Sequence, residues 1–147
     1  MTKPGKSIWR SIIVTGVAVT AFSAVALAAM STERQAVYDG YVAAAKKADA
    51  AFNGFSSERG RTFFFAKHTG GKQDSPSCTS CHTKDLTKPG KSRAGKEIKP
   101  MAASVTPTRF TNARDVEKWF TRNCPDVLGR ECTVSEKGDV LAFLLSQ

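Results

Sequence analysis

Apolar residues recur with the spacing of an α-helix in two stretches of the first half of this chain. The first helix is predicted over 32–51, where Thr-x-x-Gln can form a capping box at its start. A second, shorter helix is predicted from Ser56 or Ser57, after the Asn-Gly break that ends the first. It places Gly60 and Phe64 on one face, so another helix can approach closely at the glycine. The apolar face of the first helix comprises Val37, Tyr38, Tyr41, Val42 and Ala45.

Two more helices are predicted in the second half of the chain. One begins at Thr111 or Asn112 and carries the apolar stripe Val116, Trp119 and Phe120. The last helix begins with a Thr-x-x-Glu capping box and is strongly apolar after it. Its apolar positions are Val140, Leu141, Phe143, Leu144 and Leu145.

A polar residue interrupts the stripe of the third helix. Asn123 lies one face repeat after Val116 and therefore faces the same way. A buried amide must be hydrogen-bonded, so Asn123 is either a satisfied core or capping residue, or it points at a ligand. Pro125 predicts that the helix ends there, in a compact loop over 124–132.

The segment between the second and third helices has a different composition. Residues 83–111 show no clear periodicity and are rich in Lys, Gly and Pro. A loop of this length usually has a function or is disordered. The apolar residues of this loop are expected to make its functional contacts; they are Ile98, Pro100, Met101 and Phe110.

The N-terminal segment is predicted to be separate from the folded part. Lys3, Lys6 and Arg10 precede an apolar run that ends in Ala-Leu-Ala, as in a secretory signal peptide. Residues 1–28 are therefore predicted to be a signal peptide, with an uncleaved membrane anchor as the alternative. A helical extension over 29–55 and a main domain over 56–147 follow.

One motif points to a cofactor. Cys78-Thr79-Ser80-Cys81-His82 reads C-x-x-C-H, the attachment motif for one covalent haem c. The two thiols add to the haem vinyl groups, and His82 becomes an axial iron ligand. The alternatives are a C-x-x-C redox pair and half of a zinc site. Haem c attachment and the signal segment together predict export to the periplasm of a Gram-negative bacterium.

The other cysteines and the charge refine this interpretation. Cys124 and Cys132 are left over from the motif, and an oxidising compartment favours a disulfide between them. The net charge is +9, which suits nucleic acid, a membrane or an acidic protein partner. No basic run is interleaved with aromatic residues, so nucleic acid is not expected. An acidic redox partner or a merely solubilising surface remains.

The second axial ligand is left open by spacing alone. Met101 follows a proline, as axial methionines in small cytochromes c often do, and lies downstream of His82. His68 is the other histidine, and it precedes the motif closely. Asn123 is the third candidate.

The order of motifs resembles a known family. A Gly60-x-x-x-Phe64 helix, C-x-x-C-H, a wrapping loop and an apolar last helix resemble the class I cytochromes c. Over about 57–147, the segments Arg109-Phe110-Thr111, Arg122-Asn123-Cys124 and Gly129-Arg130-x-Cys132-Thr133 resemble the sphaeroides haem protein (SHP) family. The resemblance implies an all-α fold around one covalent haem, with an extra helix at the N-terminus. Pro125 is a local difference from the family.

The resemblance also implies site residues and partners. It makes Asn123 the sixth iron ligand, pairs Cys124 with Cys132, and leaves Met101 to pack on the haem. It further implies a dihaem cytochrome c as electron donor, and O2, NO or CO as a ligand of the reduced protein. The expected haem contacts are Ile98, Met101, Phe110, Trp119 and Phe120.

These observations predict an electron-transfer protein with a labile ligand. Asn123 coordinates through a hard carbonyl oxygen, which ferric iron holds better than ferrous iron does. Reduction is therefore expected to release Asn123 and open a site for a diatomic gas. The alternatives are an ordinary His82/Met101 electron carrier and a zinc module on the four cysteines. Enzymatic activity is left undecided, because the Asn123 segment offers no obvious proton donor.

Overall fold

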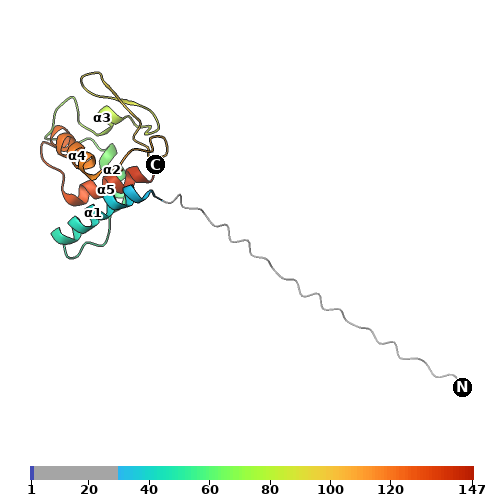
Figure 1. Ribbon diagram of the computed structural model, residues 1–147. Helices are drawn as coiled ribbons and strands as arrows, with labels where there is room; N and C mark the ends of the chain where they lie inside the picture. Colours follow the sequence, from blue (N-terminus) through green and yellow to red (C-terminus); the bar gives the residue numbers. More distant parts are fainter. Residues whose placement is uncertain (2–29) are drawn as a thin grey trace.

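The computed structural model describes Met1 and residues 30–147, which form five helices and one short hairpin (Figure 1). The predicted all-α fold is confirmed. The predicted signal segment lies, apart from Met1, outside the described residues. Within the part of the chain that the structure describes, no helix is both long enough and apolar enough to span a bilayer.

The fold centres on the crossing of α2 (Ser57–Phe65) with α5 (Val134–Leu145). Gly60 and Phe64 are the buried residues of α2, as the sequence predicts. A Cβ on Gly60 would lie 1.8 Å from the carbonyl oxygen of Asp139 in α5, so only glycine allows this approach. The buried Asp139 carboxylate accepts hydrogen bonds from Ser56 N (2.7 Å) and Arg59 Nε (2.7 Å), which join the two helices.

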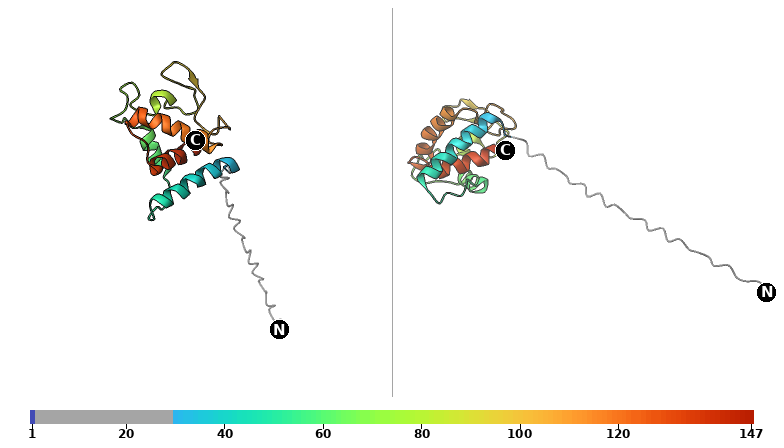
Figure 2. Two further views of the ribbon diagram at one scale, coloured as in Figure 1. Left: turned by 60° about the vertical axis from the view of Figure 1, so that its left-hand side comes forward. Right: turned by 60° about the horizontal axis from the view of Figure 1, so that its bottom comes forward.

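The additional N-terminal helix, α1 (Thr32–Ala48), lies against α5 (Figure 2). Its cap is Ser31, whose hydroxyl accepts from Arg34 N, rather than the predicted box that starts at Thr32. Arg34 donates hydrogen bonds to the carbonyl oxygens of Arg109 (3.0 Å), Ala103 (3.1 Å) and Pro107 (2.8 Å). The helix is therefore fixed to the loop that precedes α4 as well as to α5. Its buried positions are Val37, Tyr41 and Ala45.

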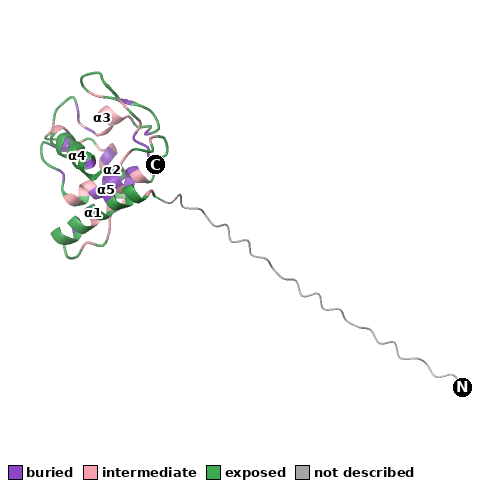
Figure 3. Ribbon diagram, viewed as in Figure 1, coloured by how far each residue is buried: buried purple, intermediate pink, exposed green. Residues whose placement is uncertain are grey.

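The fourth helix, α4 (Ala113–Leu128), is capped by Asn112, one of the two predicted residues. The prediction that Pro125 ends it is wrong, because α4 continues through Pro125 to Leu128, and its C-cap Gly129 has φ +72°. A proline in the last turn removes one helical hydrogen bond, and the left-handed glycine then stops the helix. The most buried helix is α5 (Figure 3), and both halves of its Thr133/Glu136 capping box are present.

The long loop over 83–111 contains local structure that its composition did not predict. β1 (Gly90–Lys91) and β2 (Glu97–Ile98) form an antiparallel hairpin. A Cβ on Gly90 would lie 2.0 Å from the carbonyl oxygen of Cys81. The hairpin therefore sits against the C-x-x-C-H motif.

The capping box of α5 makes stability depend on acid pH. Two hydrogen bonds from Arg130 (2.7 and 2.8 Å) lower the pKa of Glu136 from 4.5 to about 2. The ionised carboxylate therefore stabilises the fold at neutral pH, and this contribution is lost as the pH falls from 4.5 towards 2. Glu136→Gln keeps the shape but does not titrate, so its thermal midpoint should fall less steeply over this range. Identical acid profiles for the two proteins would contradict the assignment.

Candidate haem site

The C-x-x-C-H motif folds into the short helix α3 (Thr79–His82), with Cys78 at its cap position. Ser77 orients this turn, because its hydroxyl accepts from Thr79 N (3.2 Å) and donates to the carbonyl of Phe64 in α2 (3.2 Å). The amide of His82 donates to the carbonyl of Cys78 (3.1 Å). Both thiols, of Cys78 and Cys81, are free. The turn thus presents two unpaired thiols and one imidazole from a single segment.

His82 is in the form that a metal ligand requires. Burial, with the nearby charge of Arg109, lowers the pKa of His82 to about 4, so its imidazole is neutral at pH 7. Its Nδ1 atom is buried and has no hydrogen-bond partner among the residues that the structure describes. Its ring lies 6.2 Å from the ring of Phe64. A buried nitrogen without a partner next to two free thiols fits covalent haem c attachment.

The thiol chemistry argues against the redox and zinc alternatives. Burial raises the pKa of Cys78 to about 11, whereas reactive cysteine pairs have lowered values. Cys124 and Cys132 are joined in a disulfide and cannot bind zinc as thiolates. Nor, within residues 30–147, do three or more His, Cys, Asp or Glu side chains gather around a metal-sized space.

Three of the predicted haem contacts lie with Cys78 in one apolar cluster. Met101 is buried there, and Phe110 and Phe120 pack against its edge. Phe110 has φ +62°, a strained backbone for an aromatic residue. Ile98 is half-buried in β2. The remaining buried members of the cluster are Phe64, Leu86, Ala102, Val140, Phe143 and Leu144.

The buried face of α4 differs from the predicted stripe. Its buried residues are Val116, Cys124, Val127 and Leu128, while Trp119 is 51% exposed and Asn123 is exposed. Of the predicted stripe, Val116 is buried and Phe120 is half-buried, whereas protein side chains do not cover Trp119 or Asn123. Asn123 follows the buried Val116 by seven residues, nearly two helical turns, and therefore points close to the same direction. Trp119 and Asn123 lie along one flank, where their contact with a haem stays a prediction.

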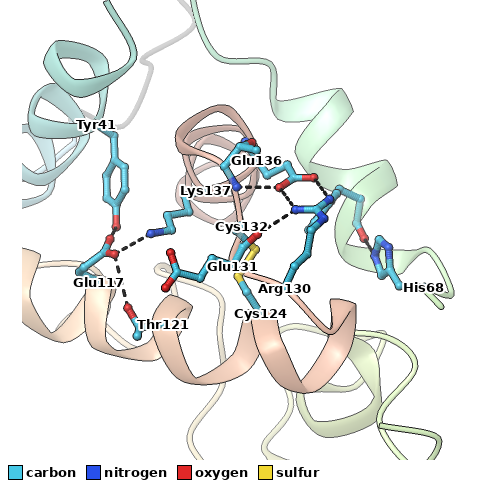
Figure 4. The surroundings of a disulfide bond; sticks show 12 residues. Tyr41, His68, Glu117, Thr121, Cys124, Arg130, Glu131, Cys132, Glu136 and Lys137 are labelled. Carbon is cyan, nitrogen blue, oxygen red and sulfur yellow. Dashed lines mark hydrogen bonds and ion pairs between the residues drawn. A yellow bond between two sulfur atoms is a disulfide. The ribbon is translucent and has the colours of Figure 1, made fainter. Parts of the chain in front are cut away.

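The disulfide lies directly after Asn123 and joins the end of α4 to the start of α5 (Figure 4). It is the pairing expected from the sequence. The surrounding side chains brace α4 further, since Glu117 accepts from Tyr41 Oη (2.8 Å) and Lys137 Nζ (2.6 Å). Asn123 therefore lies on a helix that is hydrogen-bonded to both α1 and α5.

His68 is engaged elsewhere. Its Nε2 atom lies 2.9 Å from the carbonyl oxygen of Phe63, and its ring lies 4.7 Å from the ring of Phe63. These contacts hold it in the loop before the motif. These contacts favour Met101 and Asn123 over His68 as the sixth ligand.

Arg109 is a site residue that the sequence reasoning missed. It donates to the carbonyl oxygens of Pro100 (3.0 Å) and Lys99, and so shapes the backbone that leads into Met101. Its charge also acts on His82. The only signal in the sequence was its place in the Arg-Phe-Thr segment.

Two cavities flank the motif segment. One of about 770 Å³ is lined mainly by α2 and residues 84–87, with Ala102, Phe143 and Gln147, and includes neither motif cysteine. The other, of about 380 Å³, lies between the motif and the hairpin. Its lining residues are Asp74, Ser80, Cys81, Lys91, Ser92 and Arg93.

Comparison with known proteins gives a consistent result. The family described as "Domain of unknown function (DUF1924)" matches residues 50–144. The chain is 49% identical to cytochrome c-type protein SHP of Cereibacter sphaeroides over 122 residues, 83% of this chain and 89% of SHP. It is 38% identical to cytochrome c'' of Methylophilus methylotrophus over 127 residues, 86% of this chain and 88% of the relative.

The solved structures agree with these relatives. The structure of oxidised SHP, described as an oxygen-binding cytochrome c, matches with a TM-score of 0.71 and 49% identity. That match covers 78% of this chain and 96% of the SHP chain. Oxidised cytochrome c'' from Methylophilus methylotrophus matches with a TM-score of 0.63 and 36% identity, over 78% of this chain and 94% of the relative.

Proposed function

Because this chain belongs to the SHP family of c-type cytochromes, we propose that it is an exported electron-transfer protein that binds a diatomic gas when reduced. The observation that carries this proposal is the match to SHP, an oxygen-binding cytochrome c, over nearly the whole of that chain. One haem c, held by Cys78, Cys81 and His82, would supply one-electron chemistry and an iron site for O2, NO or CO. The buried, neutral imidazole of His82 supports its role as the permanent axial ligand.

Asn123 is the proposed labile ligand. Its amide oxygen is a hard, neutral donor, which suits ferric iron and binds ferrous iron weakly. Reduction therefore favours release of Asn123, and the freed amide stays near enough to donate a hydrogen bond to a bound gas. Its place beside the Cys124–Cys132 disulfide, on a helix braced from two sides, supports a defined position for the released side chain.

Met101 supports a second candidate function. It is buried in the apolar cluster against which Cys78 packs, and this supports a role as the axial ligand of an ordinary electron carrier. Soft sulfur stabilises ferrous iron and raises the reduction potential. Such a protein keeps six ligands when reduced and leaves no position for a gas.

The surface suits an acidic redox partner, which we propose to be a dihaem cytochrome c. Residues 84–99 contain six basic and two acidic residues, and this segment packs against the motif through Gly90. Complementary charge accelerates the encounter of redox partners. Export to the periplasm through residues 1–28 is part of the same proposal, since covalent haem attachment and the disulfide both suit that compartment.

The test is the visible spectrum of the dithionite-reduced holoprotein with and without CO. Release of Asn123 predicts high-spin, five-coordinate ferrous iron whose spectrum changes on adding CO. A low-spin ferrous spectrum that ignores CO, with a near-infrared sulfur-to-iron band in the oxidised protein, would overturn the proposal in favour of Met101. A colourless purified protein would contradict both.

A further inference from the structure

The turn of α4 that carries Asn123 contains Pro125. Proline has no N–H, so the carbonyl of Thr121 lacks its helical hydrogen bond at this point. The last turn of α4 is therefore held less firmly from within the helix than the turns before it. A ligand placed on such a turn depends on contacts from outside the helix.

Those contacts converge on Asp126. Its backbone carbonyl accepts from Lys72 N (2.7 Å), and its carboxylate accepts from Arg93 Nη2 (2.9 Å) and pairs with Lys72 Nζ (2.5 Å). The backbones are in close contact as well, because a Cβ on Gly71 would lie 2.4 Å from the carbonyl oxygen of Asp126. Asp126, the residue after Pro125, therefore pairs with two cationic side chains and accepts a hydrogen bond from one backbone amide.

Both cations come from segments that flank the haem attachment motif. Lys72 precedes Cys78 in the loop that leads into α3. Arg93 lies at the tip of the hairpin that packs on Cys81 through Gly90, and it lines the cavity beside that cysteine. Ion pairs on Asp126 therefore fix the Asn123 turn relative to the residues that would hold the haem.

We propose that Asp126 is a positioning residue, whose ion pairs with Lys72 and Arg93 hold Asn123 towards the iron and slow its dissociation. This inference rests on the proposed function, in which Asn123 is the sixth ligand. The side chain of Asp126 is 31% exposed and those of Lys72 and Arg93 are 49% and 41% exposed. Salt should therefore screen these ion pairs. The dissociation rate of Asn123 should then depend on the salt concentration.

The test uses the ferric holoprotein and added imidazole as the probe. If Asn123 must leave before imidazole binds, the limiting rate at high imidazole concentration reports the dissociation of Asn123. Asp126→Asn and Arg93→Gln should each raise this rate by about two- to fivefold, the range expected for partly exposed ion pairs. Raising the salt concentration should accelerate the wild-type protein and have a smaller effect on Asp126→Asn.

Asp74→Asn is the matched control. Asp74 also pairs with Arg93, but at 3.7 Å and with 65% of its side chain exposed, and it does not lie on α4. Its rate should equal that of the wild type. The proposal is overturned if Asp126→Asn behaves like the wild type, or if Asp74→Asn has the same effect as Asp126→Asn.

The variant Asn123→Ala tests the proposed function, in which Asn123 is the sixth ligand, separately from the role of Asp126. With no side-chain ligand to displace, it should bind imidazole rapidly and without salt dependence. A wild-type rate in Asn123→Ala would overturn the proposed function. A fast Asn123→Ala together with an unaltered Asp126→Asn would overturn only the role of Asp126.

Discussion

Replacing Asn123 by Ala is expected to change the ferric absorption spectrum while CO binding to the reduced protein survives. Alanine offers no donor, so the oxidised iron would bind water or have no sixth ligand. If reduction releases Asn123 as proposed, the iron position for CO does not depend on this side chain, so CO should still bind to the variant. Ferric affinity for imidazole should rise on the order of tenfold or more, because the competing ligand is gone. Spectra of both redox states, with and without CO and imidazole, measure these changes.

Met101→Leu is the matched comparison for that experiment. Leucine conserves volume in a buried apolar site, so the fold should tolerate it. If Asn123 is the ligand, this variant keeps the wild-type ferric spectrum. An unchanged spectrum in Asn123→Ala together with an altered one in Met101→Leu would assign the iron to Met101.

Replacing Gly60 by Ala is expected to destabilise the holoprotein by about 3 kcal/mol, at the upper end for overpacking. The added methyl group would lie 1.8 Å from Asp139 O, 2.3 Å from its carbonyl carbon and 2.8 Å from Val140 N. All three atoms are backbone, so no rotamer change can relieve the clash. The helices α2 and α5 must separate, which would also disturb the Asp139 hydrogen bonds to α2. Urea unfolding followed by far-ultraviolet circular dichroism measures the loss.

Gly40→Ala is the matched control, and it is expected to stabilise the protein where Gly60→Ala destabilises it. Gly40 lies inside α1 with nothing within 4 Å of an added Cβ. Alanine there should stabilise the protein by up to about 1 kcal/mol, since glycine is a poor helix former. Equal effects of the two substitutions would show that the α2–α5 contact is not as close as described.

Local features were the most predictable from the sequence. The Thr133 capping box, the Asn112 cap and the Gly60/Phe64 face depend on residues within one or two turns, and each appears as expected. The C-x-x-C-H motif likewise carries its chemistry in five consecutive positions. Periodicity and capping rules are sufficient for such features.

Some features of α4 were not predicted from its sequence. The exposure of Trp119 and Asn123 among the side chains of the protein does not follow from the spacing of apolar residues along α4. The continuation of the helix through Pro125 is matched by contacts to Asp126 from Lys72 and Arg93. The spacing of residues along one helix contains no information about either.

Arg34 ties the behaviour of two remote segments together. Its guanidinium holds three carbonyl groups of the segment over 103–109, about seventy positions away in the chain, and that segment lies between Met101 and the strained Phe110. Opening of this segment and fraying of the first turn of α1 therefore belong to one cooperative unit of local unfolding, because neither can move without breaking the same hydrogen bonds. Helix α1 lies outside the residues that the family matches, yet its Arg34 hydrogen bonds are expected to contribute to the local stability of the segment that follows Met101.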